Sequence, residues 1–220
     1  MIAPRPTTMF GTMSTSPNEM LADALEARNI EAAAALRDGR RMRAERGRAA
    51  VLTAAYELVN SGEHTTIAMI AERAGVSERT VFRYFPDREA LMAGIAGELF
   101  PIIEPYVALD VPDVDFDARL DQLLRRRVEL VQIGGRFAAA VDHEARSSAL
   151  GQALRALRTE QLREQTRLFL GPDVVERNAA VLPVIDALLD HTPITGLLDG
   201  NSADDVVAML RVAVERLLQR

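Results

Sequence analysis

The side chains best suited to chemistry in this sequence are two arginines and a glutamate in the segment SERTVFRYF, residues 77–85. The guanidinium of Arg79 can bridge the O6 and N7 atoms of guanine in the major groove of DNA. Arg83 offers the same group one helical turn later, and Glu78 can accept from cytosine or stabilise a helix N-terminus. The spacing therefore favours contacts to base edges if these side chains share an exposed helix face.

Further polar side chains surround these three and are suited to phosphate. Hydroxyl and guanidinium groups are common donors to phosphate oxygens. The candidates are Thr66, Thr80, Tyr84 and Arg88, and Ser77 is a candidate DNA contact as well as a helix cap. Together these residues predict a surface that follows a DNA backbone.

Two short helices must position these groups. Ile67, Ile70, Ala71 and Ala74 have the spacing of one helix face, and Gly75 then permits a left-handed turn. A second helix begins after Ser77, buries Val81 and Phe85, and ends at Pro86; Asp87 can cap a third. The pattern fits a helix-turn-helix. By period alone, an ordinary helical hairpin with a glycine cap fits equally well.

The residue types favour the first interpretation, because this stretch resembles the helix-turn-helix of the tetracycline-repressor (TetR) family of bacterial transcription regulators. The matching residues are Thr65-Thr66-Ile67, Ile70-Ala71, Ala74-Gly75-Val76-Ser77, Thr80-Val81-Phe82, Tyr84-Phe85 and Glu89-Ala90-Leu91, preceded by Val51-Leu52, Ala54-Ala55, Leu58-Val59 and Gly62. The resemblance covers residues ~44 to ~95. The family usually has tyrosine at Phe82, lysine at Arg88 and often glycine at Arg79, so a phenolic phosphate contact at Phe82 is lost.

The arginine-rich run RRMRAERGR, residues 40–48, leads into the first helix, expected from about Ala44 to Ser61. Such a run is either a solvated helix end or, as the resemblance implies, an arm along phosphates, with Arg43 and Arg46 as candidate contacts. Residues 1–39 form an extension. Its first 15 residues are expected to be disordered, and a capping box predicts a helix over 16–37. Met42 is an alternative start.

Composition limits the remaining classes. The chain has 220 residues, no cysteine, three histidines and a net charge of −6. Without cysteine, disulfides and thiol-ligated metals are excluded. Ten arginines outnumber eight acidic residues between Arg37 and Ile95, so the local charge is positive. No uncharged apolar run of about 18 residues or signal-peptide pattern occurs. We therefore expect a cytoplasmic protein with no membrane span, cofactor or metal.

The pattern predicts an all-α fold with an N-terminal DNA-binding domain, residues 40–100, and a C-terminal domain, residues 101–220. After Leu91 the third helix should continue to about Leu99, where Pro101 and Pro105 limit or kink it. The C-terminal helices are expected at 115–131, 136–146 after an interruption at Gly134-Gly135, 148–170, 173–190 with a kink at Pro183, 194–198 and 202–218. A capping box of Ser202 and Asp205 opens the last of them.

The resemblance implies that the C-terminal domain binds a small molecule and pairs two subunits. The expected dimer contact is a four-helix bundle from the last two long helices, 173–190 and 202–218, of each subunit. The operator should then be an inverted repeat. The few aromatic residues could line a ligand cavity, and the candidates are Phe100, Tyr106, Phe116, Phe137 and His143.

Several functions compete. The leading one is a ligand-responsive repressor that binds a palindromic operator as a homodimer. A regulator of the same fold could instead be an activator or answer to a protein partner. An enzyme is disfavoured because no nucleophile–base pair, phosphate loop or metal spacing appears. A DNA-compacting protein without sequence preference should carry a positive net charge.

Overall fold

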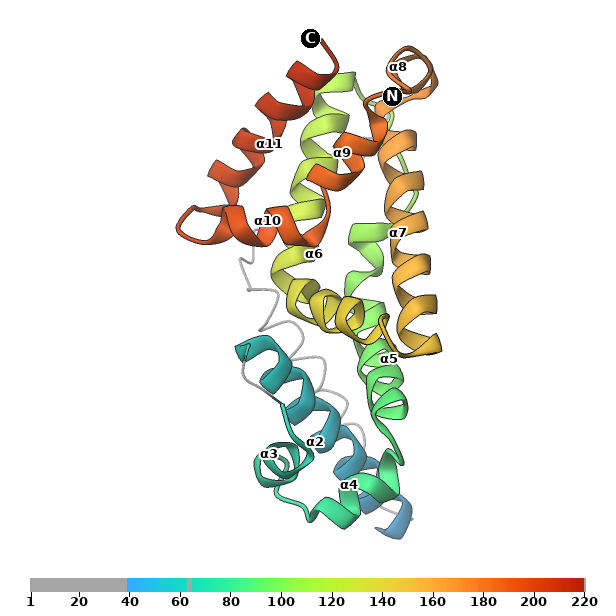
Figure 1. The fold of residues 1–220 in the computed structure, drawn as a ribbon, viewed down its shortest axis with the longest axis vertical. Coiled ribbons are helices and arrows are strands. Elements are labelled where there is room, and N and C mark those ends of the chain that lie inside the picture. Colours follow the sequence, from blue (N-terminus) through green and yellow to red (C-terminus); the bar gives the residue numbers. More distant parts are fainter. Residues whose placement is uncertain (1–38, 63–64, 220) are drawn as a thin grey trace, which may run out of the picture.

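The structure is a computed structural model that describes residues 39–62 and 65–219, and every element in these ranges is a helix. The predicted all-α class is confirmed, with the helix-turn-helix followed by further helices. The helix predicted over 16–37, the segment 1–15 and His64 lie outside the described ranges. The described helices are α2 Gly39–Ser61, α3 Ile67–Arg73, α4 Glu78–Tyr84, α5 Arg88–Val107, α6 Phe116–Glu144, α7 Ala149–Leu170, α8 Pro172–Arg177, α9 Leu182–Leu188, α10 His191–Leu198 and α11 Ala203–Leu217 (Figure 1).

Helices α2, α3 and α4 form the lower end of the molecule in Figure 1, with the start of α5 beside them. Their boundaries follow the predicted caps. The Thr66 hydroxyl accepts from the Met69 amide at 3.2 Å, Ser77 accepts from Thr80 at 3.3 Å, and Asp87 accepts from Ala90 at 2.7 Å. Gly75 has φ +67°, the left-handed conformation that the turn requires. We call α2 to α4 with the first half of α5 the head.

Helix α2 begins earlier than expected, because residues 39–43 continue it N-terminally. The arginine-rich run therefore forms the first turns of a helix. Arginine, alanine, methionine and glutamate all have high helix propensity, and this segment contains little else.

Helix α5 does not stop before its prolines and runs to Val107 with both inside it. Each proline frees the carbonyl four residues earlier, here those of Gly97 and Pro101. Gly97, Pro101 and Pro105 are all exposed, so the freed carbonyls lie on the side that faces water. The predicted domain boundary between residues 100 and 101 thus falls within a continuous helix.

Helix α6 is one helix of 29 residues, and the predicted interruption at Gly134-Gly135 is wrong. The two glycines allow neighbouring elements to approach. A Cβ on Gly135 would lie 3.3 Å from the Thr195 hydroxyl of α10, and one on Gly134 would lie 3.6 Å from Leu99 of α5. Close packing, not a turn, is therefore what these glycines provide, and α6 changes direction partway along its length (Figure 1).

The single helix predicted over 173–190 is also wrong. It is divided into α8 and α9 by a turn, and Pro183 lies in the first turn of α9 rather than in a helix interior. Proline is well suited to that position because its missing N–H has no partner there. Asp190 caps α10, which therefore starts three residues before the predicted Ile194. The last helix, α11, opens with the predicted capping box of Ser202 and Asp205.

Two apolar cores meet along α6, which contributes side chains to both. The first lies inside the head and includes Ile133, Phe137 and Val141 of α6. The second joins the first half of α6 to α7, α9, α10 and α11. Helix α5 is the one described helix long and apolar enough in composition to cross a membrane. Its residues Leu91 to Leu99 nonetheless supply four side chains to the core of the head.

Candidate nucleic-acid interface and cavity

Helix α4 presents an exposed face that carries two arginines and an aromatic ring. Arg79, Phe82 and Arg83 are all exposed, and their i, i+3, i+4 spacing puts them on one face. Glu78 is exposed in the first turn. Phe82, at 49% exposure, can contact a thymine methyl group, which is an apolar feature of the major groove. The face combines donors for guanine with a contact for thymine.

Buried contacts hold α4 against the rest of the head. Val81 and Phe85 are 0% and 2% exposed. The guanidinium of Arg48 on α2 lies 4.8 Å from the centre of the Phe85 ring. Gly94 of α5 is close to the same ring, because a Cβ there would lie 2.8 Å from Phe85 Cε1. The orientation of α4 is therefore fixed directly by α2 and α5.

The candidate phosphate contacts lie around this face. Thr66 and Ser77 are exposed caps of α3 and α4, and Thr80 is half-buried with its hydroxyl 3.0 Å from that of Ser77. Tyr84 is half-buried and lies against α2, since a Cβ on Gly47 would be 2.6 Å from its hydroxyl. That hydroxyl accepts from Arg83 Nη2 at 3.3 Å.

Arg43 and Arg46 lie on the exposed first turns of α2. Arg46 donates to the carbonyl of Met42 at 3.3 Å, within its own helix. The structure thus brings Tyr84 beside α2, the helix that carries these two arginines. Helix α2 and helix α4 together supply the candidate DNA-contacting arginines Arg43, Arg46, Arg79 and Arg83.

The guanidinium of Arg88 forms an ion pair with Glu144 at the end of α6, a contact that the sequence did not predict. The next residue, Glu89, accepts a hydrogen bond from the hydroxyl of Ser148, the cap of α7. We call these two contacts the α5 clasp. Arg88 remains 64% exposed, so the ion pair leaves its side chain accessible to a phosphate. The clasp ties the first turn of α5 to the corner between α6 and α7.

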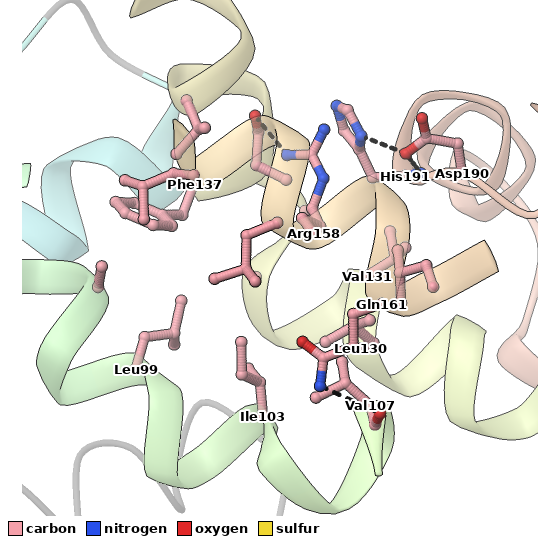
Figure 2. A pocket seen from close by; sticks show the side chains of 18 of the residues that line it. Leu99, Ile103, Val107, Leu130, Val131, Phe137, Arg158, Gln161, Asp190 and His191 are labelled. Atoms are coloured by element: carbon pink, nitrogen blue, oxygen red, sulfur yellow. Dashed lines mark hydrogen bonds and ion pairs between the residues drawn. The ribbon is translucent and has the colours of Figure 1, made fainter. Parts of the chain in front are cut away.

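A cavity of about 140 Å³ lies between α5, α6 and α7 (Figure 2). Its walls are mainly apolar, and α5 contributes Leu99, Phe100, Ile103 and Val107. Other apolar walls are Leu130, Val131, Phe137, Ala138, Val141, Leu154, Leu157, Leu162 and Leu189. An apolar cavity with few polar groups is a typical small-molecule site.

One end of the cavity is polar. The ring of His191 lies between two carboxylates, with Nδ1 2.8 Å from Asp190 and Nε2 3.6 Å from Asp142. Arg158 donates to the Ala138 carbonyl at 3.2 Å and to Asp142 at 2.7 Å. Figure 2 shows Arg158, His191 and Asp190 on one side of the cavity. These groups are already paired with each other.

The predicted ligand-lining residues are divided by the structure. Phe100 and Phe137 line the cavity, whereas Tyr106, Phe116 and His143 do not. Phe116 packs at the start of α6 in the second core, Tyr106 packs against the first, and His143 is exposed. Sequence reasoning missed Arg158, Gln161, Asp190 and His191. Within the described residues, no group of three or more His, Asp or Glu side chains is suited to a metal ion.

The exposed face of α4, capped by Ser77 and packed on α2 and α5, defines a helix-turn-helix DNA-binding protein. Residues 51–95 match the model of a protein family described as bacterial regulatory proteins, tetR family. Residues 51–95 therefore form a TetR-type helix-turn-helix domain, and this match supports a DNA-binding transcription regulator. Comparison with curated proteins and with solved structures gave no significant match.

The pair of Asp190 and His191 makes a testable contribution to stability. The hydrogen bond from His191 lowers the pKa of Asp190 from 3.8 to about 2. Because this carboxyl is more acidic in the folded protein, its contribution is complete above about pH 4 and disappears as the pH falls towards 2. We expect Asp190→Asn to lower the free energy of unfolding by about 1 kcal/mol at pH 7, after allowing for solvent screening.

Urea unfolding at pH 7 and at lower pH measures this effect. The deficit of the variant should shrink below about pH 4, and asparagine keeps the capping oxygen of α10. Asp199→Asn, at an exposed position on the other end of α10, is the control and should be neutral. A deficit that does not change between pH 7 and pH 3 would contradict the assignment.

Proposed function

We propose that this TetR-family regulator is a ligand-responsive repressor that acts in the cytoplasm as a homodimer on a palindromic operator. The observation that carries the proposal is the double role of α5. Its first half packs under α4 through Leu91, Met92 and Ile95, and its second half forms a wall of the cavity. A molecule in the cavity therefore touches the helix that supports the DNA-reading face.

Recognition of the operator is assigned to α4. Arg79 and Arg83 would contact guanine, Phe82 would contact a thymine methyl, and Glu78 would accept from cytosine. Thr66, Ser77, Thr80, Tyr84, Arg43 and Arg46 would contact phosphates and set the register. One helix of seven residues covers only a few base pairs, so a second copy is needed to read a full site.

The α5 clasp supports a route from cavity to DNA. A ligand that displaces Ile103 or Phe100 would shift the second half of α5 relative to α6 and α7. Because Arg88 and Glu89 hold the first turn of α5 to the α6–α7 corner, that shift would rotate the head rather than slide it. A coupling of about 1–3 kcal/mol would weaken operator binding roughly 5- to 150-fold.

The dimer surface is assigned to α11 with α9. Met209 and Val212 of α11 are 43% and 50% exposed, and Val184 of the adjoining α9 is 53% exposed. Helix α11 lies at the outer edge of the molecule, on the side opposite α7 (Figure 1). The division of residues 173–190 leaves only α9 to accompany α11, so the expected bundle contains one shorter helix per subunit.

Arg79 provides the test of DNA reading. Sites would be selected from random duplex DNA with the full chain, and affinity for the selected site measured for Arg79→Ala. Loss of a bidentate contact to guanine should weaken binding roughly 5- to 150-fold and relax preference at one position in each half-site. Arg177→Ala on α8, at the far end of the molecule, should bind like the unchanged protein (Figure 1). Equal affinities for Arg79→Ala and the unchanged protein would show that α4 does not read bases through Arg79.

Val212 provides the test of the dimer. A charge at the centre of an apolar contact is costly to bury, so Val212→Glu should produce monomers at micromolar concentration and lose operator binding. Sedimentation velocity measures the change in mass. Leu168→Glu on α7, at a position that is 42% exposed and outside the cavity lining, is the matched control and should remain dimeric. A dimer that survives Val212→Glu with unchanged affinity would exclude this surface.

A further inference from the structure

Arg127 is a buried charged residue that takes no part in the proposed contacts to DNA or between subunits. It projects from the middle of α6, is 1% exposed, and lines the cavity described above. It also lines a second, more polar hollow of about 230 Å³ on the side of α9. Its guanidinium therefore stands between an apolar space and a polar one.

The hydrogen bonds of this guanidinium are incomplete. Nη2 donates to the carbonyl of Leu162 and to the hydroxyl of Thr166, the latter at 3.0 Å. Nε and Nη1 are buried and have no acceptor among the described residues. A buried donor without a partner costs roughly 1–3 kcal/mol, and more when it is charged.

The nearby carboxylates are engaged elsewhere. Asp186 pairs with Arg163 at 3.7 Å and with Arg167 at 3.3 Å. Asp142 pairs with Arg158, and Asp190 with His191. Around the two hollows, five arginines face these three aspartates, so the region keeps an excess of positive charge. Burial lowers the pKa of Arg127 to about 10, and that leaves the group charged at neutral pH.

The size of the apolar space limits the partner. A cavity of about 150 Å³ in another protein holds one benzene molecule, and the apolar cavity here is about 140 Å³. A body of roughly six carbon atoms fills it. An anionic group at one end of such a body would meet the free donors of Arg127, which compact anions satisfy well.

We propose that the effector is a small amphipathic carboxylate, whose apolar body lies among Leu99, Ile103, Leu130 and Phe137 and whose carboxylate accepts from Arg127. This inference rests on the proposed effector role of the cavity and adds its chemistry. Replacing a buried charge by an apolar group often stabilises a protein, so a buried arginine needs a reason. Binding of a carboxylate supplies one for Arg127. The bound carboxylate completes the hydrogen bonding of Arg127.

Calorimetry with hexanoate, 1-hexanol and inorganic phosphate tests the proposal on the full chain. Hexanoate should bind at least about 30-fold more tightly than hexanol, because the alcohol cannot pair with the guanidinium. Phosphate alone should bind weakly, because it gains nothing from the apolar walls. Along the series from butanoate to decanoate, affinity should peak near six to eight carbons. Equal affinity for hexanoate and hexanol would overturn the proposal. So would phosphate binding as tight as that of hexanoate, with no dependence of carboxylate affinity on chain length.

Variants at Arg127 separate this role from a structural one. Arg127→Met should lose about 30-fold or more in hexanoate affinity, keep its hexanol affinity, and melt no lower than the unchanged protein without ligand. Arg127→Lys should recover part of the hexanoate binding. Arg125→Met, an exposed arginine on the same helix, is the control and should bind hexanoate normally. Hexanoate binding that survives Arg127→Met would exclude Arg127 as the partner.

Operator binding is measured separately, so the two proposals can fail independently. Hexanoate that binds through Arg127 but leaves operator affinity unchanged would uphold the site and contradict the ligand-responsive function. Operator binding without any carboxylate binding would overturn the site and leave DNA recognition standing.

Discussion

The packing of α5 against both the recognition helix and the cavity is the constraint on which the rest of the structure depends. Phe85, at the end of α4, is 2% exposed and packs directly on Gly94 of α5, where a Cβ would lie 2.8 Å from the Phe85 ring. Gly94 precedes the cavity-lining residues Phe100, Ile103 and Val107 by only 6 to 13 positions along α5. Within one continuous helix, a displacement at one end is carried to the other. The helix tolerates its two interior prolines because the carbonyls that they free lie on the side that faces water.

Helix α6 forms the fixed counterpart. The hydroxyl of Tyr56 on α2 donates to the carbonyl of Ile133 on α6 at 2.7 Å. This buried contact joins α2 to the middle of α6. Ile133, Phe137 and Val141 of α6 complete the core of the head. The head is therefore held at two places, by the Tyr56 contact and by the α5 clasp. In the proposed ligand response, movement of α5 between them would change the angle of α4 without unfolding either core.

The predictions that succeeded were those whose causes are local in sequence. Thr66, Ser77, Asp87 and Ser202 cap their helices through bonds that span three residues, and Gly75 turns the chain by its own conformation. The predictions that failed depended on distant partners. The glycines at 134 and 135 serve contacts with Leu99 and Thr195, 35 to 60 residues away, and no local rule separates that use from a turn.

The candidate sites follow the same division. The face of α4 could be predicted because its exposed and buried positions alternate within one short helix. The polar end of the cavity could not, because Arg127, Arg158 and His191 come from α6, α7 and α10. Three consecutive arginines at 125–127 look alike in sequence, yet Arg127 is buried with no ion pair among the described residues, whereas Arg125 and Arg126 pair with aspartates. Only the fold distinguishes them.

The central claim is that occupation of the cavity alters DNA binding through α5. A substitution that fills the cavity tests it without any ligand, and Ala138→Leu adds three carbon atoms at a wall that is 8% exposed. The measurement is the affinity of this variant for the selected operator, with dimerisation and folding verified. We predict a loss of roughly 5- to 150-fold. Unchanged affinity in a variant whose cavity is filled would contradict the account.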